Sequence, residues 1–385
     1  MQPPQAMPVY ARPTLTPVAW QSSTPTLTPQ RPPVFQPTPY GARPPGQWAP
    51  VPGQQAPFRA PGPYGAPPQW QRPQRSSSGL LVALVLAGGA LAALLLFIVI
   101  DSMGRSNDIA ADYQNEDYEL PPVTSSPPDL VYPEDSNEAE TYLRDNALYN
   151  VSMASPVRCE VQLDGTAKSD DQLEEHLQTF FGCLTRAWGP SLEAAGFTAY
   201  TPRITIFPSN SEVQTPCGAS PAPNAFYCPK DQRIYLSQDI VSALPEESAA
   251  ARSNFYLITA HEYGHAMQGR TGLITSSVMQ QYDAETDEEA LEVSRRVETQ
   301  ADCFAGTALN SLGQSLGVTD EDRADMLQSL YDIGDDQLRA RAGVDPNEAG
   351  DHGRGENRQL WGSRGFDSLS LGTCNTFVAP SSEVK

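Results

Sequence analysis

The sequence predicts one α+β domain, preceded by a single membrane-spanning helix and a disordered N-terminal tail. Three observations predict this organisation. Proline is concentrated in residues 1–78, which hold 21 of the 37 prolines, and an uncharged apolar run follows at 79–100. Beyond about residue 140, apolar residues at helical spacing alternate with short strand-like segments. That last part has roughly 245 residues, which is enough for one domain with a full core and excludes a multidomain enzyme.

The tail at 1–78 contains six Arg and no Lys, Asp or Glu, so subtracting these charges from the net charge of −21 leaves −27 for the rest of the chain. Its few apolar side chains cannot offset the entropy cost of ordering the backbone, which predicts disorder. A polyproline II ligand for a cytoplasmic partner would fit the composition, but a solvated tether is the favoured interpretation. The Arg residues are too dispersed to predict a nucleic-acid partner.

The apolar run from Gly79 to Ile100 predicts a transmembrane helix. Its 22 residues give about 33 Å of helix, which crosses a hydrocarbon core of about 30 Å. A cleaved signal peptide is the alternative, but the long preceding tail and the missing small-residue cleavage site argue against it. Arg72 and Arg75 precede the run and mainly acidic residues follow it, so the N-terminus is expected in the cytoplasm. We expect a single-pass cell-membrane protein with an acidic linker at 101–140 and an extracytoplasmic domain at 141–385.

The cysteines support that location. All six follow the apolar run, none lies in the tail, and no C-x-x-C pair occurs. An even number without that motif indicates a disulfide framework in an oxidising compartment, whereas buried free thiols in a reducing cytosol are the alternative. Six cysteines allow 15 connectivities, and their spacing alone selects none. They are Cys159, Cys183, Cys217, Cys228, Cys303 and Cys374.

The segment 253–268 carries the strongest chemical signal. It lacks proline and repeats apolar residues at helical spacing, which predicts a helix with its N-cap at one of the first two residues. His261 and His265 lie one turn apart on it, so both imidazoles can bind one Zn²⁺ ion. Glu262 projects beside them and can take a proton from a water in the open coordination position. Two hydrogen-bonded core histidines are the alternative, but half of the four His in the chain would then share this spacing by chance.

A catalytic zinc site needs a third protein ligand, and the only other His residues are His176 and His352. A carboxylate is therefore favoured. Residues 289–306 predict a second helix on which Glu298 and Asp302 share a face. Glu298 would complete a His₂Glu site, and Asp302 could accept the spare N–H of a ligand imidazole. Other carboxylates compete as the third ligand: Asp287, Glu288, Glu289 and Glu292. They cluster at the start of the same helix, and this position suits the helix dipole better than it suits metal binding.

Two longer motifs make the chain recognisable. His261-Glu-Tyr-Gly-His-Ala-Met-Gln268 and Glu298-Thr-Gln-Ala-Asp-Cys-Phe-Ala-Gly306 resemble the "putative neutral zinc metallopeptidase" family of bacterial membrane-anchored proteins. The resemblance covers about residues 155–380. It implies a gluzincin-like zincin fold with one zinc ion on His261, His265 and Glu298, and with Glu262 as the catalytic base. Guided by it, we expect the disulfides Cys159–Cys183, Cys217–Cys228 and Cys303–Cys374.

The remaining polar residues carry weaker predictions. His352, in a Gly-rich segment, could stabilise the oxyanion of a hydrated peptide carbonyl, and a structural loop His is an equal alternative. Residues 354–357 depart from the family pattern, so the resemblance leaves the roles of His352 and Arg358 open. His176 is expected on the solvated side of an amphipathic helix. Residues 202–207 and 233–236 alternate like strands, and one of them is expected to be the edge strand that pairs with an extended substrate.

Together these observations predict a membrane-anchored, zinc-dependent endopeptidase that hydrolyses extracytoplasmic peptides or proteins. Glu262 would accept the proton of the attacking water and pass it to the leaving amine. The alternative is a non-catalytic adhesion or scaffold module with a structural or vestigial zinc site. An open coordination position with an exchangeable water distinguishes the two.

Overall fold

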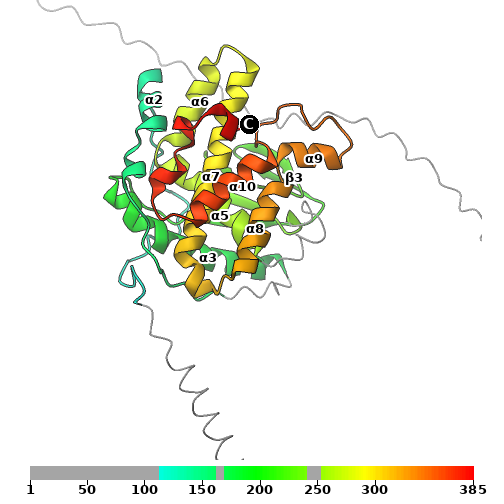
Figure 1. The fold of residues 1–385 in the computed structure, drawn as a ribbon. Coiled ribbons are helices and arrows are strands. Elements are labelled where there is room, and N and C mark those ends of the chain that lie inside the picture. The colour runs from blue at the N-terminus through cyan, green and yellow to red at the C-terminus, as the bar shows by residue number, and fades with distance from the viewer. Residues whose placement is uncertain (1–111, 162–168, 241–252) are drawn as a thin grey trace, which may run out of the picture. The chain divides into compact units, whose positions relative to one another are not determined.

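The structure, a computed structural model, describes residues 112–161, 169–240 and 253–385 (Figure 1). The predicted tail at 1–78 and the predicted transmembrane helix at 79–100 lie outside these residues. Within the described ranges, no helix combines the length and the apolar character that crossing a membrane requires. The described residues form an α+β domain, as the sequence predicts.

Helices dominate this domain. The α-helices are α2 (Ser136–Arg144), α3 (Asp170–Ala194), α5 (Asn254–Arg270), α6 (Leu273–Asp283), α7 (Asp287–Leu316), α8 (Asp320–Asp332), α9 (Asp335–Arg341) and α10 (Gly355–Phe366). Short 3₁₀ turns lie at η1 (Ala147–Asn150), η3 (Leu371–Cys374), η4 (Thr376–Val378) and η5 (Ser381–Glu383). The strands are β1 (Arg203–Phe207), β2 (Glu212–Thr215), β3 (Gly218–Pro221), β4 (Ala225–Cys228) and β5 (Arg233–Ser237). In Figure 1, α6 and the first turns of α7 project together from the body.

A three-stranded mixed sheet packs against the helices. Its order is β1-β5-β4, with β1 parallel and β4 antiparallel to β5, while β2 and β3 form a separate hairpin. Ile204 and Ile234 point into the main core together with residues of α3 and α5. Phe207 and Tyr235 point to the opposite face, into a small cluster beside the hairpin. This alternation is the period of two that the sequence shows in both predicted strands.

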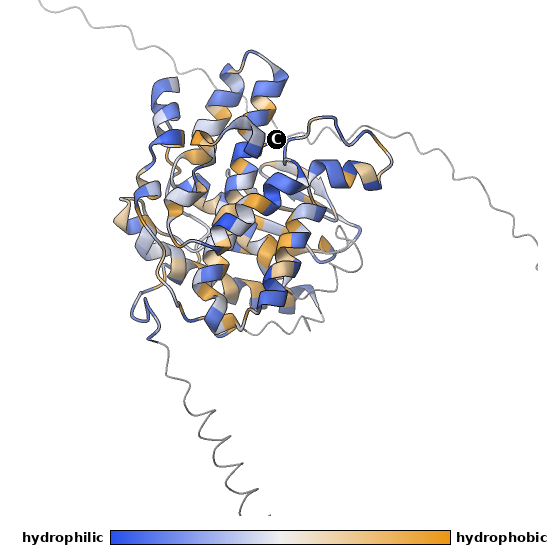
Figure 2. Cartoon of the chain, in the orientation of Figure 1, coloured by the Kyte–Doolittle hydropathy of each residue, from blue (hydrophilic) through white to orange (hydrophobic). Residues whose placement is uncertain are grey.

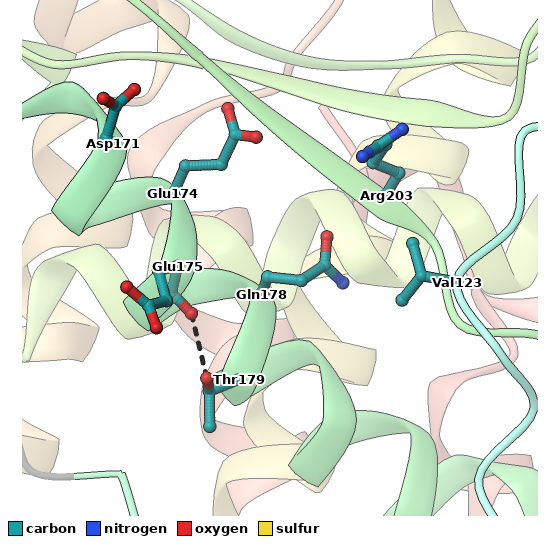
Figure 3. Close-up of a pocket in the computed structure, with 7 residues that line it drawn as sticks. All are labelled: Val123, Asp171, Glu174, Glu175, Gln178, Thr179 and Arg203. Atoms are coloured by element: carbon teal, nitrogen blue, oxygen red, sulfur yellow. Dashed lines mark hydrogen bonds between the residues drawn. The ribbon is translucent and has the colours of Figure 1, made fainter.

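The two edges of this sheet differ, and the central position of β5 excludes 233–236 as an edge strand. At the β1 edge, the amide of Ile204 donates to Gln178 Oε1 at 3.1 Å and that of Ile206 donates to Glu174 Oε2 at 3.0 Å. Both side chains project from α3 beside a cavity of about 470 Å³ (Figure 3). Side chains thus take the place of a further strand at β1. The opposite edge of the sheet is β4. Among the described residues it pairs only with β5, and it lies against α5.

Residues 112–135 lie along the domain surface, which differs from the spacer expected at 101–140. Gln114 and Val123 form isolated parallel bridges with Val157 and Thr201. Buried Arg270, the last residue of α5, donates to the carbonyls of Pro128 and Asp129 at 2.6 and 2.8 Å. Helix α2 then begins within the range assigned to the linker. The reason is that buried donors of the domain are satisfied by the carbonyls of this segment.

Helix α5 is buried on almost every side, including its charged residues Glu262 and Arg270. Figure 2 shows hydrophobic residues, in orange, on the helices at the centre of the domain. The expected N-cap does not form, because Ser253 has helical φ and ψ and makes no capping bond. Instead, the neighbouring Asn254 side chain accepts a hydrogen bond from Ser329 on α8. Small residues let α5 approach α7: a Cβ added to Gly264 would lie 3.2 Å from the Ala301 carbonyl oxygen. The zinc-motif helix and the second predicted helix therefore cross in close contact.

Three disulfides link parts of the domain, and all three expected pairings are confirmed. Cys159–Cys183 ties the segment after η1 to α3, and Cys217–Cys228 ties the hairpin to the end of β4. Cys303–Cys374 joins α7 to the C-terminal turns. Because Cys303 follows Asp302, this last bond fixes the C-terminal segment next to the site helix.

Candidate metal centre

Three side chains from α5 and α7 converge as predicted. His261 Nε2 lies 3.1 Å from His265 Nε2 and 3.3 Å from Glu298 Oε2, and His265 Nε2 lies 3.5 Å from Glu298 Oε1. The three side chains are 9%, 11% and 15% exposed. The i, i+4 spacing places both imidazoles on one face of α5, and the close crossing of the helices brings Glu298 opposite them.

Asp302 holds the first imidazole from the next turn of α7. Its Oδ1 lies 2.8 Å from His261 Nδ1, as predicted, and both of its oxygens also accept from Arg358 on α10, each at 2.9 Å. Burial raises the pKa of Asp302, but the positive charges of Arg358 and His261 outweigh it and hold this pKa below its usual value. Asp302 is therefore an ionised acceptor, so His261 carries a proton on Nδ1.

A side-chain amide holds the second imidazole. His265 Nδ1 lies 2.8 Å from Gln268 Oε1, and Gln268 Nε2 donates to the Val297 carbonyl at 2.8 Å. A carbonyl can only accept, so the amide nitrogen faces Val297 and the amide oxygen faces His265. His265 therefore also carries its proton on Nδ1, and its Nε2 lone pair points to Glu298.

This arrangement fits a zinc ion. Two Nε2 atoms and a carboxylate at 3.1 to 3.5 Å need a positive charge among them. Without a metal, a proton supplies it: burial lowers the pKa of His261, but Asp302 and Glu298 raise it to about 9. Donors of a tetrahedral zinc ion with bonds of about 2.0–2.1 Å are separated by about 3.3–3.4 Å, close to the observed spacings. A His₂Glu set also leaves one position for a water.

Glu262 has the environment of a general base. The residue is buried, and its Oε2 has no hydrogen-bond partner within the described part of the chain. Burial raises its pKa above the usual value, against the opposing charges of His265 and His261. An unpaired buried carboxylate oxygen is costly, so its retention beside the imidazoles indicates a partner such as a water at the open coordination position.

The competing carboxylates have other partners. Glu289 forms a capping box with Thr286 at the start of α7. Glu288 pairs with Arg295 at 2.6 Å, and Glu292 pairs with Arg296 at 2.7 Å. Asp287 lies in the first turn of the same helix, where negative charge suits the dipole. The helix N-terminus thus accounts for this cluster.

His352 lies in a loop beside α7. Its Nδ1 is 2.8 Å from Asp351 Oδ1, and its backbone amide donates to Asp335 Oδ2 at 2.9 Å. The next residue, Gly353, packs on α7, since an added Cβ would lie 3.6 Å from Thr299 Cγ2. The His352 side chain is 52% exposed. The charge of His352 lowers the pKa values of both Glu298 and Glu262, so the imidazole lies near the metal centre. It groups with Asp335 and Asp351, outside the set of three ligands.

The structure corrects one expectation and adds residues. His176 is not merely solvated, because its Nε2 contacts the hydroxyl of Tyr256, which lies on α5 five residues before His261. Gln268, Gln300 and Arg358 belong to the site, although the sequence assigned them no role. Gln268 and Gln300 do occur in the two motifs quoted above, which is the only sequence signal for them. Arg358 directly follows residues 354–357, where the chain departs from the family pattern.

Comparison with known proteins gives one family and several relatives. The model of the family described as "Putative neutral zinc metallopeptidase" matches residues 145–377, more than half of the chain. The chain is 29% identical over 235 residues to the uncharacterized protein YpfJ of Escherichia coli (strain K12), covering 60% of this chain and 80% of YpfJ. It is 30% identical over 220 residues to the uncharacterized protein Rv2575 of Mycobacterium tuberculosis, covering 52% and 72%. No solved structure matches the chain.

Proposed function

Because the chain belongs to the putative neutral zinc metallopeptidase family, we propose that its domain is a zinc-dependent endopeptidase acting on extracytoplasmic peptides or proteins. The observation that carries this proposal is the pairing of a three-donor set with a buried, unpartnered base. His261, His265 and Glu298 would hold the metal, and Glu262 Oε2 lies beside them without another partner among the described residues. A purely structural zinc site uses four protein ligands and has no need of such a base.

The residues of the chain divide the hydrolysis of a peptide bond between them. When bound, zinc lowers the pKa of a coordinated water and polarises the scissile carbonyl. Glu262 accepts a proton from the attacking water at its free oxygen and delivers it to the leaving amine nitrogen as the C–N bond breaks. Asp302 and Gln268 keep both imidazoles in the tautomer that presents Nε2 to the metal. His352 would donate a hydrogen bond to the oxyanion, oriented by Asp351.

Strand β4 is the proposed platform for an extended substrate. Ser237 of β5 donates to the Asn224 carbonyl just before β4, so that pair is hydrogen-bonded. Because bonded and non-bonded pairs alternate in an antiparallel ladder, the backbone groups of Ala225 and Tyr227 face away from β5. Tyr227 also lies beside Gly269, one turn past His265. The Ala225 amide already donates to Asn224 Oδ1 at 2.9 Å. A substrate strand would therefore pair with the Ala225 carbonyl and the backbone groups of Tyr227, and it would run alongside α5.

Removing the metal tests the proposed activity. A strong chelator should abolish peptide hydrolysis by the purified full-length chain, and stoichiometric Zn²⁺ should restore it, since Glu262 alone cannot activate water sufficiently. The measurement is cleavage of a diverse peptide mixture followed by mass spectrometry. Hydrolysis that persists in metal-free protein would contradict the zinc mechanism. A zinc-loaded chain that cleaves nothing in the mixture would favour the adhesion or scaffold alternative.

We also propose that the chain is anchored in the cell membrane by residues 79–100, with the tail at 1–78 in the cytoplasm. The Arg residues before the apolar run and the disulfides after it support this orientation. Protease added to intact cells should remove the domain and spare the tail, as detected with epitope tags at each end. A protected domain with an accessible tail would reverse the orientation.

A further inference from the structure

A chain of buried amides runs from the second imidazole away from the metal centre. Gln268 Oε1 faces His265 Nδ1, and Gln268 Nε2 donates to Gln300 Oε1 at 3.0 Å as well as to the Val297 carbonyl. Gln300 Nε2 in turn donates to the Cys374 carbonyl at 3.1 Å and to the Tyr149 hydroxyl at 2.8 Å. Both glutamine side chains are fully buried. Each of their polar atoms therefore has a protein partner.

The carbonyl acceptors determine the direction of every hydrogen bond that Gln268 and Gln300 make. The Cys374 carbonyl can only accept, so the Gln300 nitrogen faces it and the Gln300 oxygen faces Gln268. The Gln268 nitrogen must then face Gln300, which leaves its oxygen for His265. The Val297 carbonyl imposes the same orientation independently. A flipped Gln268 amide would set oxygen against oxygen at Val297, which leaves buried groups unpaired. At His265 it would either set N–H against N–H or move the imidazole proton to Nε2, the atom that faces Glu298.

The same amide acts on a second ligand. Val297 immediately precedes Glu298, so the bond from Gln268 Nε2 anchors the backbone of α7 next to the carboxylate ligand. One side chain on α5 thus holds the imidazole of its own helix and the position of the opposite helix. Neither role involves contact with the metal or substrate. Asp302 and Arg358 provide the equivalent support for His261, but through charges rather than neutral amides.

We propose that Gln268, fixed in orientation by Gln300, is a positioning residue for both His265 and Glu298 and thereby sets zinc affinity. This inference rests on the proposed function, because it assumes that these residues hold zinc. Such supporting groups change metal affinity by about 10–100-fold when they are removed. Gln300 acts only through Gln268, since none of its hydrogen bonds reaches a ligand.

The test measures zinc binding, not activity. In the purified full-length chain, Gln268→Met keeps an unbranched side chain but removes both hydrogen-bonding ends. We expect its Zn²⁺ dissociation constant, determined by competition with a chromophoric chelator, to rise about 10–100-fold. The visible absorption spectrum of the Co²⁺-loaded chain should also change, because the ligand geometry changes. Gln300→Met should weaken binding less, and the double variant should bind no more weakly than Gln268→Met, as residues acting in series do.

Gln178→Met is the matched control. Gln178 also bridges two backbone groups, at Pro202 and Ile204, but it supports β1 rather than the metal centre. It should lower the melting temperature and leave zinc affinity and the Co²⁺ spectrum unchanged. Three results would each overturn the inference. The first is an unaltered Zn²⁺ dissociation constant and Co²⁺ spectrum in Gln268→Met. The others are additive losses of zinc affinity in the double variant, and a loss of zinc affinity in Gln178→Met equal to that in Gln268→Met. If the parent chain binds no zinc, the proposed function fails with it.

Discussion

Glu262→Gln should retain about one zinc ion per chain and lose peptide hydrolysis by a factor of at least about 10²–10⁴. Gln has the same shape as Glu, so the packing of α5 and both imidazoles is preserved, but its amide cannot accept a proton. The free oxygen of Glu262, buried without a partner among the described residues, is the atom that this substitution removes from the chemistry. The measurements are metal content of the purified protein and cleavage rate at saturating zinc.

The matched control is Glu292→Gln, which alters a carboxylate on α7 that pairs with Arg296 and lies outside the metal centre. It should hydrolyse peptides at the rate of the parent. If Glu262→Gln cleaved as fast as this control, Glu262 would not be the base and the mechanism would be wrong. Loss of zinc in Glu262→Gln would instead show that the carboxylate supports the metal.

Glu298→Ala should abolish both zinc retention and hydrolysis. Of the carboxylates on α7, it is the one within 3.3 and 3.5 Å of the two Nε2 atoms, and two imidazoles alone leave the ion without its third protein ligand. Asp302→Asn is the graded comparison: it weakens the acceptor for His261 without removing a ligand, so zinc affinity should fall about 10–100-fold. Both effects are measured by zinc competition and by metal analysis after dialysis.

The acidic first turn of α7 supplies the control. Substituting Glu288 or Glu292 should leave zinc stoichiometry unchanged, because these side chains pair with Arg295 and Arg296. The gluzincin assignment would be wrong if Glu298→Ala kept stoichiometric zinc while a substitution in this acidic cluster or of His352 lost it. A different ligand set would then be required.

The sequence by itself determined the features that depend on local spacing. His261 and His265 share a face because an α-helix advances 3.6 residues per turn, and no tertiary contact is needed to establish that. Glu298 and Asp302 are related in the same way on α7. The period of two in 202–207 and 233–236 likewise predicted β1 and β5. The sequence analysis did not predict α6, the helix that connects the two site helices. The disulfide pairs followed from the family resemblance, not from spacing.

Only the tertiary structure decided which groups meet across elements. It selected Glu298 over the other α7 carboxylates, joined Arg358 of α10 to Asp302, and set Gln268 against Val297 and Gln300. It also placed β5 at the centre of the sheet, leaving β4 as the edge beside α5, and laid residues 112–135 along the domain. Helical and strand periodicity specify which face a side chain occupies, but not which other face it contacts. That choice depends on close packing between distant segments, such as the crossing at Gly264 and Ala301, which no single segment encodes.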